Sequence, residues 1–173
     1  GATGRGNRRG NQHAEVSLQL LSPIPGTLRN LAELSDPVFA QEIMGPGFAI
    51  FPDEVDTLNI LAPIDGTLTH QLPHACALTT PDGLSILIHA GIDTVLLKGE
   101  GFSAPHQLGQ HVHAGSPLIT WDLRPARQAG YDLDVVVIAM QPPQTLCELL
   151  IAPGSRLDTL VPCADIRRAP KSS

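Results

Sequence analysis

The octapeptide LSPIPGTL at residues 21–28 recurs as LAPIDGTL at residues 61–68, and the two copies agree at six of eight positions. Each copy places a Pro-Ile-x-Gly turn signal between apolar residues, which is typical of a tight turn that joins two strands. Repeats with a period near forty residues also occur in solenoid proteins, but two copies are too few to form one. We therefore predict a duplicated hairpin that folds into one closed β structure.

The rest of the chain continues this alternation of short apolar runs and turn residues. It contains 16 Gly and 16 Pro, too many for a helical bundle, and only 3% aromatic residues. This composition favours many short strands around a core of Leu, Ile, Val and Ala. We predict an all-β fold: an antiparallel β-sandwich or barrel-sandwich hybrid with a few short helices. Predicted strands are 16–21, 49–51, 58–61, 75–78, 84–88, 112–121 and 135–138; predicted helices are 36–43, 104–108 and 125–130.

The length of 173 residues suits one compact domain. Residues 1–15 lack a periodic apolar pattern and are predicted to form a disordered arm. Residues 16–167 are predicted to form the folded domain, and residues 168–173 a loose tail.

Charge and cysteine content narrow the class of protein. A net charge of −6 disfavours nucleic acid as a partner and leaves room for a basic protein. Cys76, Cys147 and Cys163 form no C-x-x-C pair, which argues against a disulfide framework or a cysteine-based zinc site. The sequence contains neither an apolar run of membrane-spanning length nor a signal-peptide core, so we expect a cytoplasmic location.

Two histidines, His74 and His89, flank a type I turn signal at Thr80–Gly83. If those four residues form the loop, Thr79 opposes Leu84 in the ladder and His74 opposes His89. Directly opposed side chains have Cβ atoms about 5 Å apart, so the two imidazoles are predicted to face each other. A three-residue loop with a bulge would change this register, and the pairing is therefore a hypothesis.

Two facing histidines on apolar strands fit three roles: a structural pair, a metal site, or a nucleophile with a supporting group. Gly91 permits a close backbone approach and Asp93 adds a carboxylate near the imidazole. A neutral imidazole is a good nucleophile near pH 7 because its ordinary pKa is about 6.5. The residues themselves leave the three roles open.

Six blocks of sequence then follow one another in an order shared with one protein family. They are DPVFA (36–40), GPGFAI (45–50), APIDGT (62–67), His74-Ala75, the segment 83–95, and LKGEGF (97–102). In this order they resemble the glucose-type IIA domain of the bacterial phosphoenolpyruvate-dependent sugar phosphotransferase system. The resemblance covers residues 16–167 and implies an antiparallel β-sandwich with a shallow active-site depression.

The resemblance also implies a chemical role for the histidine pair. His89 would accept a phosphoryl group from the small carrier protein HPr, as a tele-phosphohistidine. It would then pass the group to the IIB domain of a membrane-associated IICB sugar permease, for sugar uptake with phosphorylation. His74 would stabilise the phosphoryl group without carrying it. Such a phosphotransferase component would also regulate partner proteins through its phosphorylation state.

A docking surface is implied by the same resemblance. Asp36 and Asp93 match acidic positions that would meet arginines on HPr. The matching apolar docking ring consists of Val38, Phe39, Met44, Leu87 and Val95. No cofactor is required, but the resemblance makes His74 and His89 candidate zinc ligands, completed by a carboxylate from a partner.

A zinc metallopeptidase on a related β scaffold is the alternative prediction. Such enzymes combine an H-x-x-x-D motif with an H-x-H motif, and the chain contains His89…Asp93 and His111-Val112-His113. This alternative requires three of these ligands to converge around an open position for water. A lipoyl- or biotinyl-type carrier is a further alternative, for which Lys98 would have to be the modified residue.

Overall fold

The computed structural model describes residues 17–170, so the predicted arm at 1–15 lies outside the described residues. The two copies of the repeat bind each other. The amide of Leu21 donates to the carbonyl of Pro63, and the amide of Leu61 donates to the carbonyl of Pro23, both at 2.9 Å. These reciprocal backbone bonds place the two copies side by side.

Each copy is a corner between two sheets, and the prediction of a hairpin is wrong. β1 (Ser17–Leu21) leads into β2 (Gly26–Arg29), and β4 (Thr57–Leu61) leads into β5 (Gly66–Leu72). In neither copy do the two strands pair, because each turn carries the chain from a three-stranded sheet into a large one.

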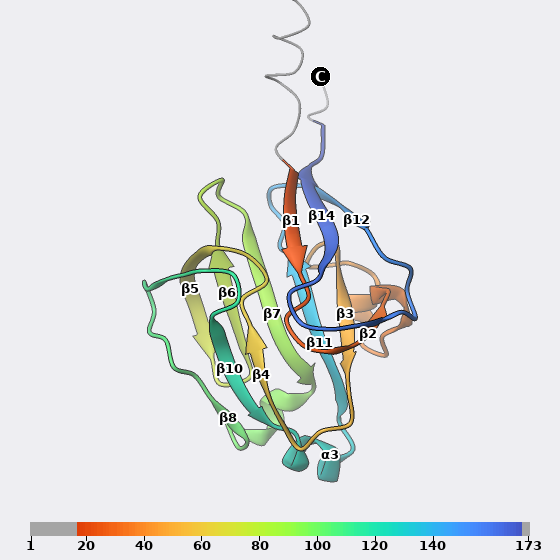
Figure 1. The fold of residues 1–173 in the computed structure, drawn as a ribbon, viewed down its shortest axis with the longest axis vertical. Helices are drawn as coiled ribbons and strands as arrows, with labels where there is room; N and C mark the ends of the chain where they lie inside the picture. The colour runs from red at the N-terminus through yellow and green to blue at the C-terminus, as the bar shows by residue number, and fades with distance from the viewer. Residues whose placement is uncertain (1–16, 171–173) are drawn as a thin grey trace, which may run out of the picture.

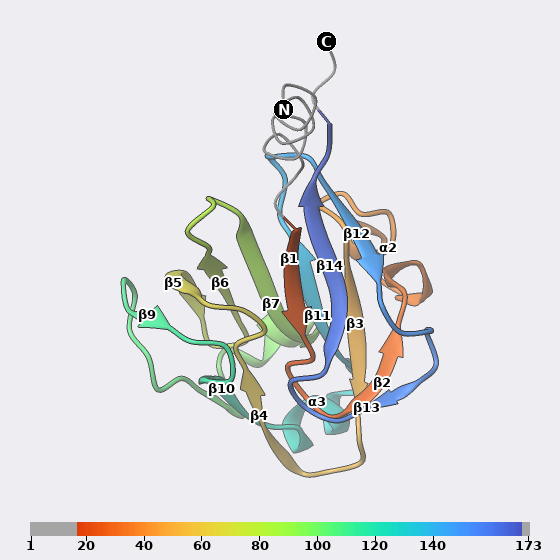
Figure 2. The same ribbon diagram turned by 45° about the horizontal axis from the view of Figure 1, so that its top comes forward.

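The large sheet has eight antiparallel strands in the order β13-β2-β3-β11-β7-β6-β5-β9. Residues 17–170 also form two three-stranded sheets, β1-β14-β12 and β4-β10-β8. In Figure 1, β4 and β10 lie in front of β6 and β7, while β1 and β14 lie in front of β11. Figure 2 shows the two ends of the large sheet, with β9 beside β5 and β13 beside β2. The remaining strands are β3 (Gly47–Pro52), β6 (Ala75–Thr79), β7 (Ser85–Ile92), β8 (Phe102–Ser103), β9 (His111–Val112), β10 (Pro117–Asp122), β11 (Asp132–Ala139), β12 (Thr145–Leu149), β13 (Arg156–Leu157) and β14 (Pro162–Arg168). The predicted all-β fold is thus confirmed.

Helices are few and short, as predicted. They are η1 (Leu31–Glu33), α2 (Pro37–Ala40), η2 (Thr94–Leu97) and α3 (Arg124–Ala129). The predicted helix at 104–108 is wrong: the segment is a loop in which the Gln110 side chain accepts from the amide of Gln107. The predicted strand 112–121 is two strands, because a turn at His113–Ser116 separates β9 from β10.

Both faces of the large sheet are buried at its centre. Along β11, Val135, Val137 and Ala139 face the main core, while Val136 and Ile138 face a second apolar cluster. The second cluster also contains Leu31, Leu34, Phe39, Ala49 and Ile92. It therefore fastens η1 and α2 onto one face of the sheet, and this face carries the candidate site.

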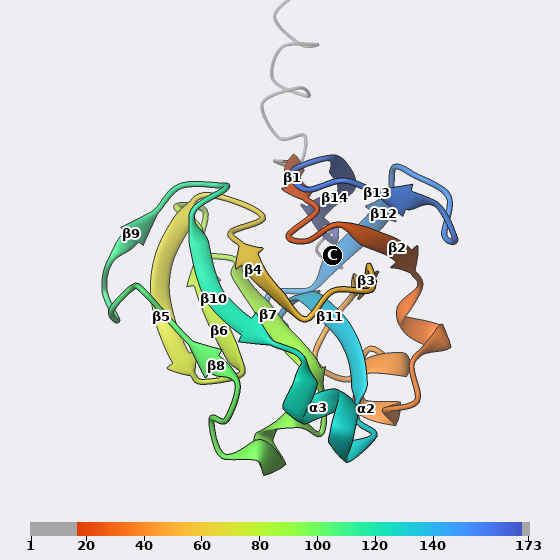
Figure 3. The same ribbon diagram turned by 60° about the horizontal axis from the view of Figure 1, so that its bottom comes forward.

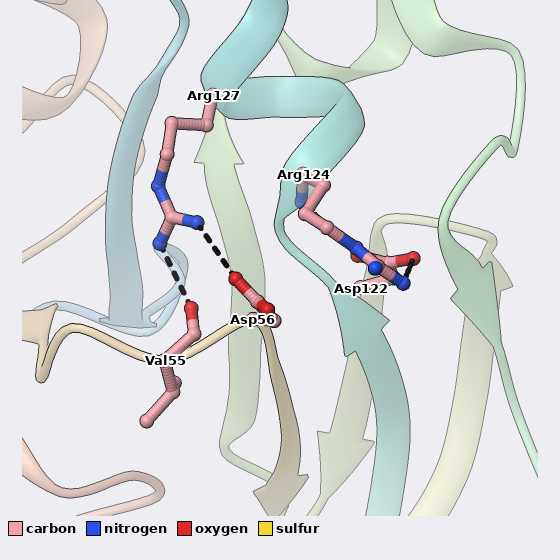
Figure 4. A network of polar contacts seen from close by, with 5 residues as sticks. All are labelled: Val55, Asp56, Asp122, Arg124 and Arg127. Carbon is pink, nitrogen blue, oxygen red and sulfur yellow. Dashed lines mark hydrogen bonds and ion pairs between the residues drawn. The ribbon is translucent and has the colours of Figure 1, made fainter.

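The lower end of the molecule is closed by η2 and α3, which contact each other (Figures 1 and 3). Arg127 on α3 donates to the carbonyl of Val55 at 2.8 Å and pairs with Asp56 at 3.5 Å. Arg124 binds both carboxylate oxygens of Asp122 at 2.9 Å (Figure 4). These exposed pairs orient α3 at the end of β10 and contribute little stability.

Candidate active site

The β6–β7 hairpin has a loop one residue shorter than predicted. Thr80 and Leu84 close the ladder: the Thr80 amide donates to the Leu84 carbonyl at 2.8 Å, and the Leu84 amide to the Thr80 hydroxyl at 3.1 Å. The loop is therefore Pro81–Gly83, with Gly83 left-handed at φ +83°. This is the three-residue hairpin that ends in a bulge, and it shifts every cross-strand pair by one residue.

The predicted direct opposition of His74 and His89 is consequently wrong. His89 pairs with Ala75, and the amide of Ala90 donates to the carbonyl of His74 at 2.8 Å. The rings nevertheless meet: their centroids lie 5.0 Å apart at 78°. His74 lies in the tight turn between Leu72 and Ala75, outside the regular ladder, so strand alternation does not dictate where its side chain points.

One hydrogen bond fixes the tautomer of His89. Its Nδ1 lies 2.7 Å from the carbonyl oxygen of Gly91. A carbonyl can only accept, so Nδ1 must carry the proton, and Nε2 keeps its lone pair. Among the described residues, Nε2 has no hydrogen-bond partner. The atom is not buried, so it is open to solvent.

Burial keeps both histidines neutral. Desolvation is the main effect that lowers the pKa of His89, to about 4; the charge of His74 lowers it further, while the Gly91 carbonyl and the Asp36 carboxylate raise it. Desolvation also lowers the pKa of His74. At pH 7 the site therefore presents an uncharged imidazole with a free Nε2, which is the reactive form of a histidine nucleophile.

Gly91 is the backbone feature that makes this arrangement fit. Its φ of +75° is left-handed, and a Cβ there would lie 2.5 Å from Thr94 Cγ2 and 2.9 Å from the Asp132 carbonyl oxygen. Two residues of β11, Leu133 and Asp134, oppose this single glycine, because Asp132 pairs with Ile92 and Val135 with Ala90. Such bulges are frequent beside active sites, where they redirect a side chain.

The segment around α2 covers His89 from one side. Asp36 caps the helix, accepting from the amide of Val38 at 2.8 Å. The Phe39 ring lies edge-on to the His89 ring at a centroid distance of 5.3 Å. Phe39 is only 5% exposed, so its side chain supports the histidine and offers a partner little surface.

The other predicted docking residues lie around this centre. Val38 and Val95 are exposed, while Met44 and Leu87 are half-buried against the second apolar cluster. Asp93 is exposed and left-handed at φ +67° immediately before η2. The structure thus brings Asp36, Phe39, His74 and His89 together, with the other predicted docking residues at the rim of this group.

Sequence analysis did not single out three exposed apolar residues near the site segments, or the aromatic residue that packs against His74. Ile43, Leu72 and Leu96 are each more than half exposed, and each lies next to a site segment in the chain. Phe102 packs edge-on to His74 at 6.4 Å and stacks on Trp121. The exposure of an apolar residue depends on neighbours distant in sequence, so the apolar pattern contained no signal for these positions.

The histidines of the metallopeptidase alternative do not converge. The rings of His111, on β9, and His113, just after it, have centroids 5.2 Å apart, and His113 Nδ1 lies 3.9 Å from Asp65. Strands β5 and β6 separate β9 from β7. Within residues 17–170, no three His, Cys, Asp or Glu side chains are grouped as metal ligands would be. The described residues therefore give the metallopeptidase alternative no support. All three cysteines are free, and Cys76 is a core residue.

In the described part of the chain, no helix has the length and apolar character needed to cross a membrane.

Comparison with known proteins agrees with the geometry. The family model for the phosphoenolpyruvate-dependent sugar phosphotransferase system, EIIA 1, matches residues 18–145. The glucose-specific EIIA component of Halalkalibacterium halodurans is 40% identical over 116 residues, which are 65% of this chain and 65% of that protein. The beta-glucoside-specific EIIBCA component of Bacillus subtilis is 41% identical over 119 residues, 68% of this chain but only 19% of that protein.

A solved structure shows the same fold. Glucose permease IIA from Mycoplasma capricolum superimposes with a TM-score of 0.75 at 31% identity, covering 87% of this chain and 96% of that one. The chain therefore spans nearly the whole of a solved IIA domain and about a fifth of the multidomain relative.

Proposed function

Since the chain belongs to the EIIA type 1 family of the phosphoenolpyruvate-dependent sugar phosphotransferase system, we propose that it is a phosphocarrier that uses His89. His89 takes a phosphoryl group from phospho-HPr through Nε2 and passes it to a IIB domain in the cytoplasm. The observation that carries the proposal is the hydrogen bond from Nδ1 of His89 to the Gly91 carbonyl, which leaves Nε2 as the free nucleophile.

The transfer itself exchanges one nitrogen–phosphorus bond for another. The Nε2 lone pair of His89 attacks phosphorus as the bond to the HPr imidazole breaks, and that bond's electrons return to the HPr ring. The phosphorylated His89 ring keeps its Nδ1 proton and gains positive character, which the Gly91 carbonyl stabilises. Phosphoryl transfer depends mainly on in-line placement and charge stabilisation, and a preformed tautomer contributes to both.

His74 has the location of a phosphoryl-stabilising group. Its ring lies 5.0 Å from the His89 ring, and burial favours its neutral form, which has one N–H to donate. A phosphoryl group on His89 Nε2 would accept a hydrogen bond from this N–H. We therefore assign His74 to stabilising the group during both transfers, without carrying it.

The rim supports docking of partners that bind briefly. Asp36 and Asp93 provide negative charge, and Val38 and Val95 provide exposed apolar surface. Opposite charges accelerate encounter, and a small apolar contact permits rapid release. A similar protein carries EIIA together with B and C components in one chain, which supports a IIB domain as the acceptor. Phosphorylation would add negative charge to this rim and so regulate further partners.

Zinc at a partner interface is a secondary proposal. His74 and His89 can supply two nitrogen ligands, and zinc usually takes four. The described residues group no third ligand with them, so a partner carboxylate would have to contribute one. The test measures zinc binding by this protein mixed with a partner that bears a carboxylate. Binding that is lost in His74→Ala would support the proposal, and equal binding by that variant would contradict it.

Phosphorylation by phosphoenolpyruvate, enzyme I and HPr tests the proposed function. We expect an acid-labile, alkali-stable label on the wild type and none on His89→Ala. His74→Ala should take the label but fail to pass it to a IIB domain. His111→Ala is the matched control, since His111 lies at β9, and it should behave as wild type. A label remaining on His89→Ala would overturn the proposal.

A further inference from the structure

A buried ion pair lies on the sheet face that carries His89. Arg29 Nη1 lies 2.9 Å from Asp134 Oδ2, and the Asp134 side chain is completely buried. The second carboxylate oxygen, Oδ1, is buried and has no hydrogen-bond partner among the described residues. Burying a carboxylate with one unpartnered oxygen costs stability, and such pairs are weak contributors to folding. The pair therefore invites an explanation other than stability.

The ladder shows how the pair relates to the site. Arg29 on β2 is opposite Ala49 on β3, and Ala49 is opposite Val136 on β11. Val136 is in turn opposite His89, and directly opposed residues share a face. Asp134 precedes Val136 by two residues and so shares this face as well. The guanidinium thus spans β3 above the small side chain of Ala49.

The same guanidinium also holds the segment that covers the site. Arg29 Nη2 donates to the carbonyl of Glu33 at 3.1 Å. The Glu33 carboxylate accepts from the amide of Asn30 at 2.8 Å, which closes η1. From there the chain continues directly to Asp36 and Phe39, the two residues that reach His89. Arg29 therefore links the sheet beneath to the start of the covering segment.

We propose that Arg29 and Asp134 are positioning residues for phosphoryl acceptance: their ion pair sets where the segment 30–40 places Asp36 and Phe39 over His89. The proposal rests on the proposed function of His89. With the ion pair intact, the Asp36 carboxylate lies where it meets an incoming cationic partner. Without it, the segment is held by the apolar contacts of Leu31, Leu34 and Phe39 and by the hydrogen bond that the Ser35 hydroxyl donates to the Asp132 carboxylate at 3.3 Å.

This positioning has a pH dependence. Burial is the largest effect that raises the pKa of Asp134, to about 7; neighbouring Asp132 raises it further and Arg29 lowers it. The elements around Asp134 place few charged groups near it. Strand β3 contains no charged residue, and the residue of β7 opposite the bulge is Gly91. From η1, Glu33 meets Arg29 through its backbone carbonyl. Asp134 is therefore ionised and paired above about pH 7 and protonated below it. Docking of phospho-HPr should weaken as the pH falls through this value.

Two single variants test the proposal in the phosphotransfer assay: Arg29→Met and Asp134→Asn. At pH 8 each should raise the KM for phospho-HPr by about tenfold, the effect of losing one charge-assisted hydrogen bond, with kcat within about twofold of wild type. The wild-type KM should rise as the pH falls below 7, and Asp134→Asn should lack this rise. Arg156→Met is the control, because it removes an exposed ion pair with Asp53, and it should change neither parameter.

A second measurement does not require phosphate. Asp36 raises the pKa of His89, so displacing the segment should lower the pKa of His89 in an NMR titration of the ring protons of Arg29→Met. If the wild type takes no phosphate, the proposed function fails. The titration still shows whether the Arg29–Asp134 pair sets the position of Asp36 over His89. The inference would be overturned if both variants fold and show the same KM, pH profile and His89 titration as the wild type.

A double variant covers the case in which the single variants unfold. Arg29→Met/Asp134→Leu replaces the pair with apolar groups and should fold, since such exchanges are often neutral or stabilising. It should keep the raised KM and the lowered pKa of His89. A wild-type KM in this variant would show that packing alone positions the segment, and would overturn the proposal.

Discussion

His89 Nδ1 and the carbonyl oxygen of Gly91 lie 2.7 Å apart, although the two residues are only two positions apart on the same strand. In a regular strand the carbonyl of residue i+2 points along the ladder and cannot reach the ring of residue i. The left-handed φ of Gly91, +75°, turns this carbonyl toward the imidazole. Backbone conformation at one glycine therefore decides which nitrogen of the histidine reacts.

Replacing Gly91 with Ala should be severely destabilising. The new Cβ would meet Thr94 and the Asp132 carbonyl at 2.5 and 2.9 Å, and φ would remain left-handed. We expect a loss of about 3 kcal/mol or more in the free energy of unfolding, measured by urea titration. Gly109→Ala is the matched control: φ is +85° but no atom lies within 4 Å, so about 1 kcal/mol should be lost. Equal losses in both variants would contradict this account.

The folded protein should gain stability from His89 as the pH rises from 4 to 6.5. The pKa of His89 is about 4 in the folded state and near 6.5 in the unfolded state, so the unfolded chain binds more protons in this window. The contribution is about 3 kcal/mol. It is present above pH 6.5 and is lost as the pH falls toward 4.

His89→Gln is the variant that checks this linkage. Its free energy of unfolding, measured by urea titration at several pH values, should rise less steeply than that of wild type between pH 4 and 6.5. Asp134 acts in the opposite direction, because its raised pKa makes the folded state bind more protons up to about pH 7. It acts alike in both proteins, so the difference between them isolates His89. Parallel pH profiles would rule the linkage out.

Asp36→Ser should separate helix capping from charge. Serine also caps helices, so the bond to the Val38 amide can be retained and the free energy of unfolding should change by less than about 0.5 kcal/mol. The loss of a negative charge beside His89 should raise the KM for phospho-HPr several-fold and flatten its salt dependence, measured by titrating NaCl. Unchanged salt dependence would mean that Asp36 does not steer the partner.

The Thr94 hydroxyl should contribute to the stability of the site. It donates to the Ala90 carbonyl at 2.6 Å and is fully buried. Thr94→Val keeps the shape and removes the donor, so we expect a loss of about 1–2 kcal/mol in thermal or urea unfolding. Thr120→Val, which loses an exposed hydroxyl bond to Asn59, should cost less than about 0.5 kcal/mol. The idea fails if the two variants lose equal stability.

The local features of the site were predictable from the chain itself. Turn signals and short apolar runs predict the β class, and the predicted helix 36–43 begins at Asp36, which caps α2. The ordered blocks around His74 and His89 predicted the family. These signals are readable because turns, caps and motifs depend on residues within a few positions of one another.

Register, burial and distant pairs were decided only by the tertiary structure. The loop at Pro81–Gly83 moved every pair of β6 and β7 by one residue, and His74 meets His89 because it lies in a turn. Arg29 and Asp134 are 105 residues apart in the chain, and neither is distinctive in the sequence. Local composition indicates which chemical groups are present, whereas the packing of distant strands determines which groups lose water and meet, and so which histidine nitrogen stays free.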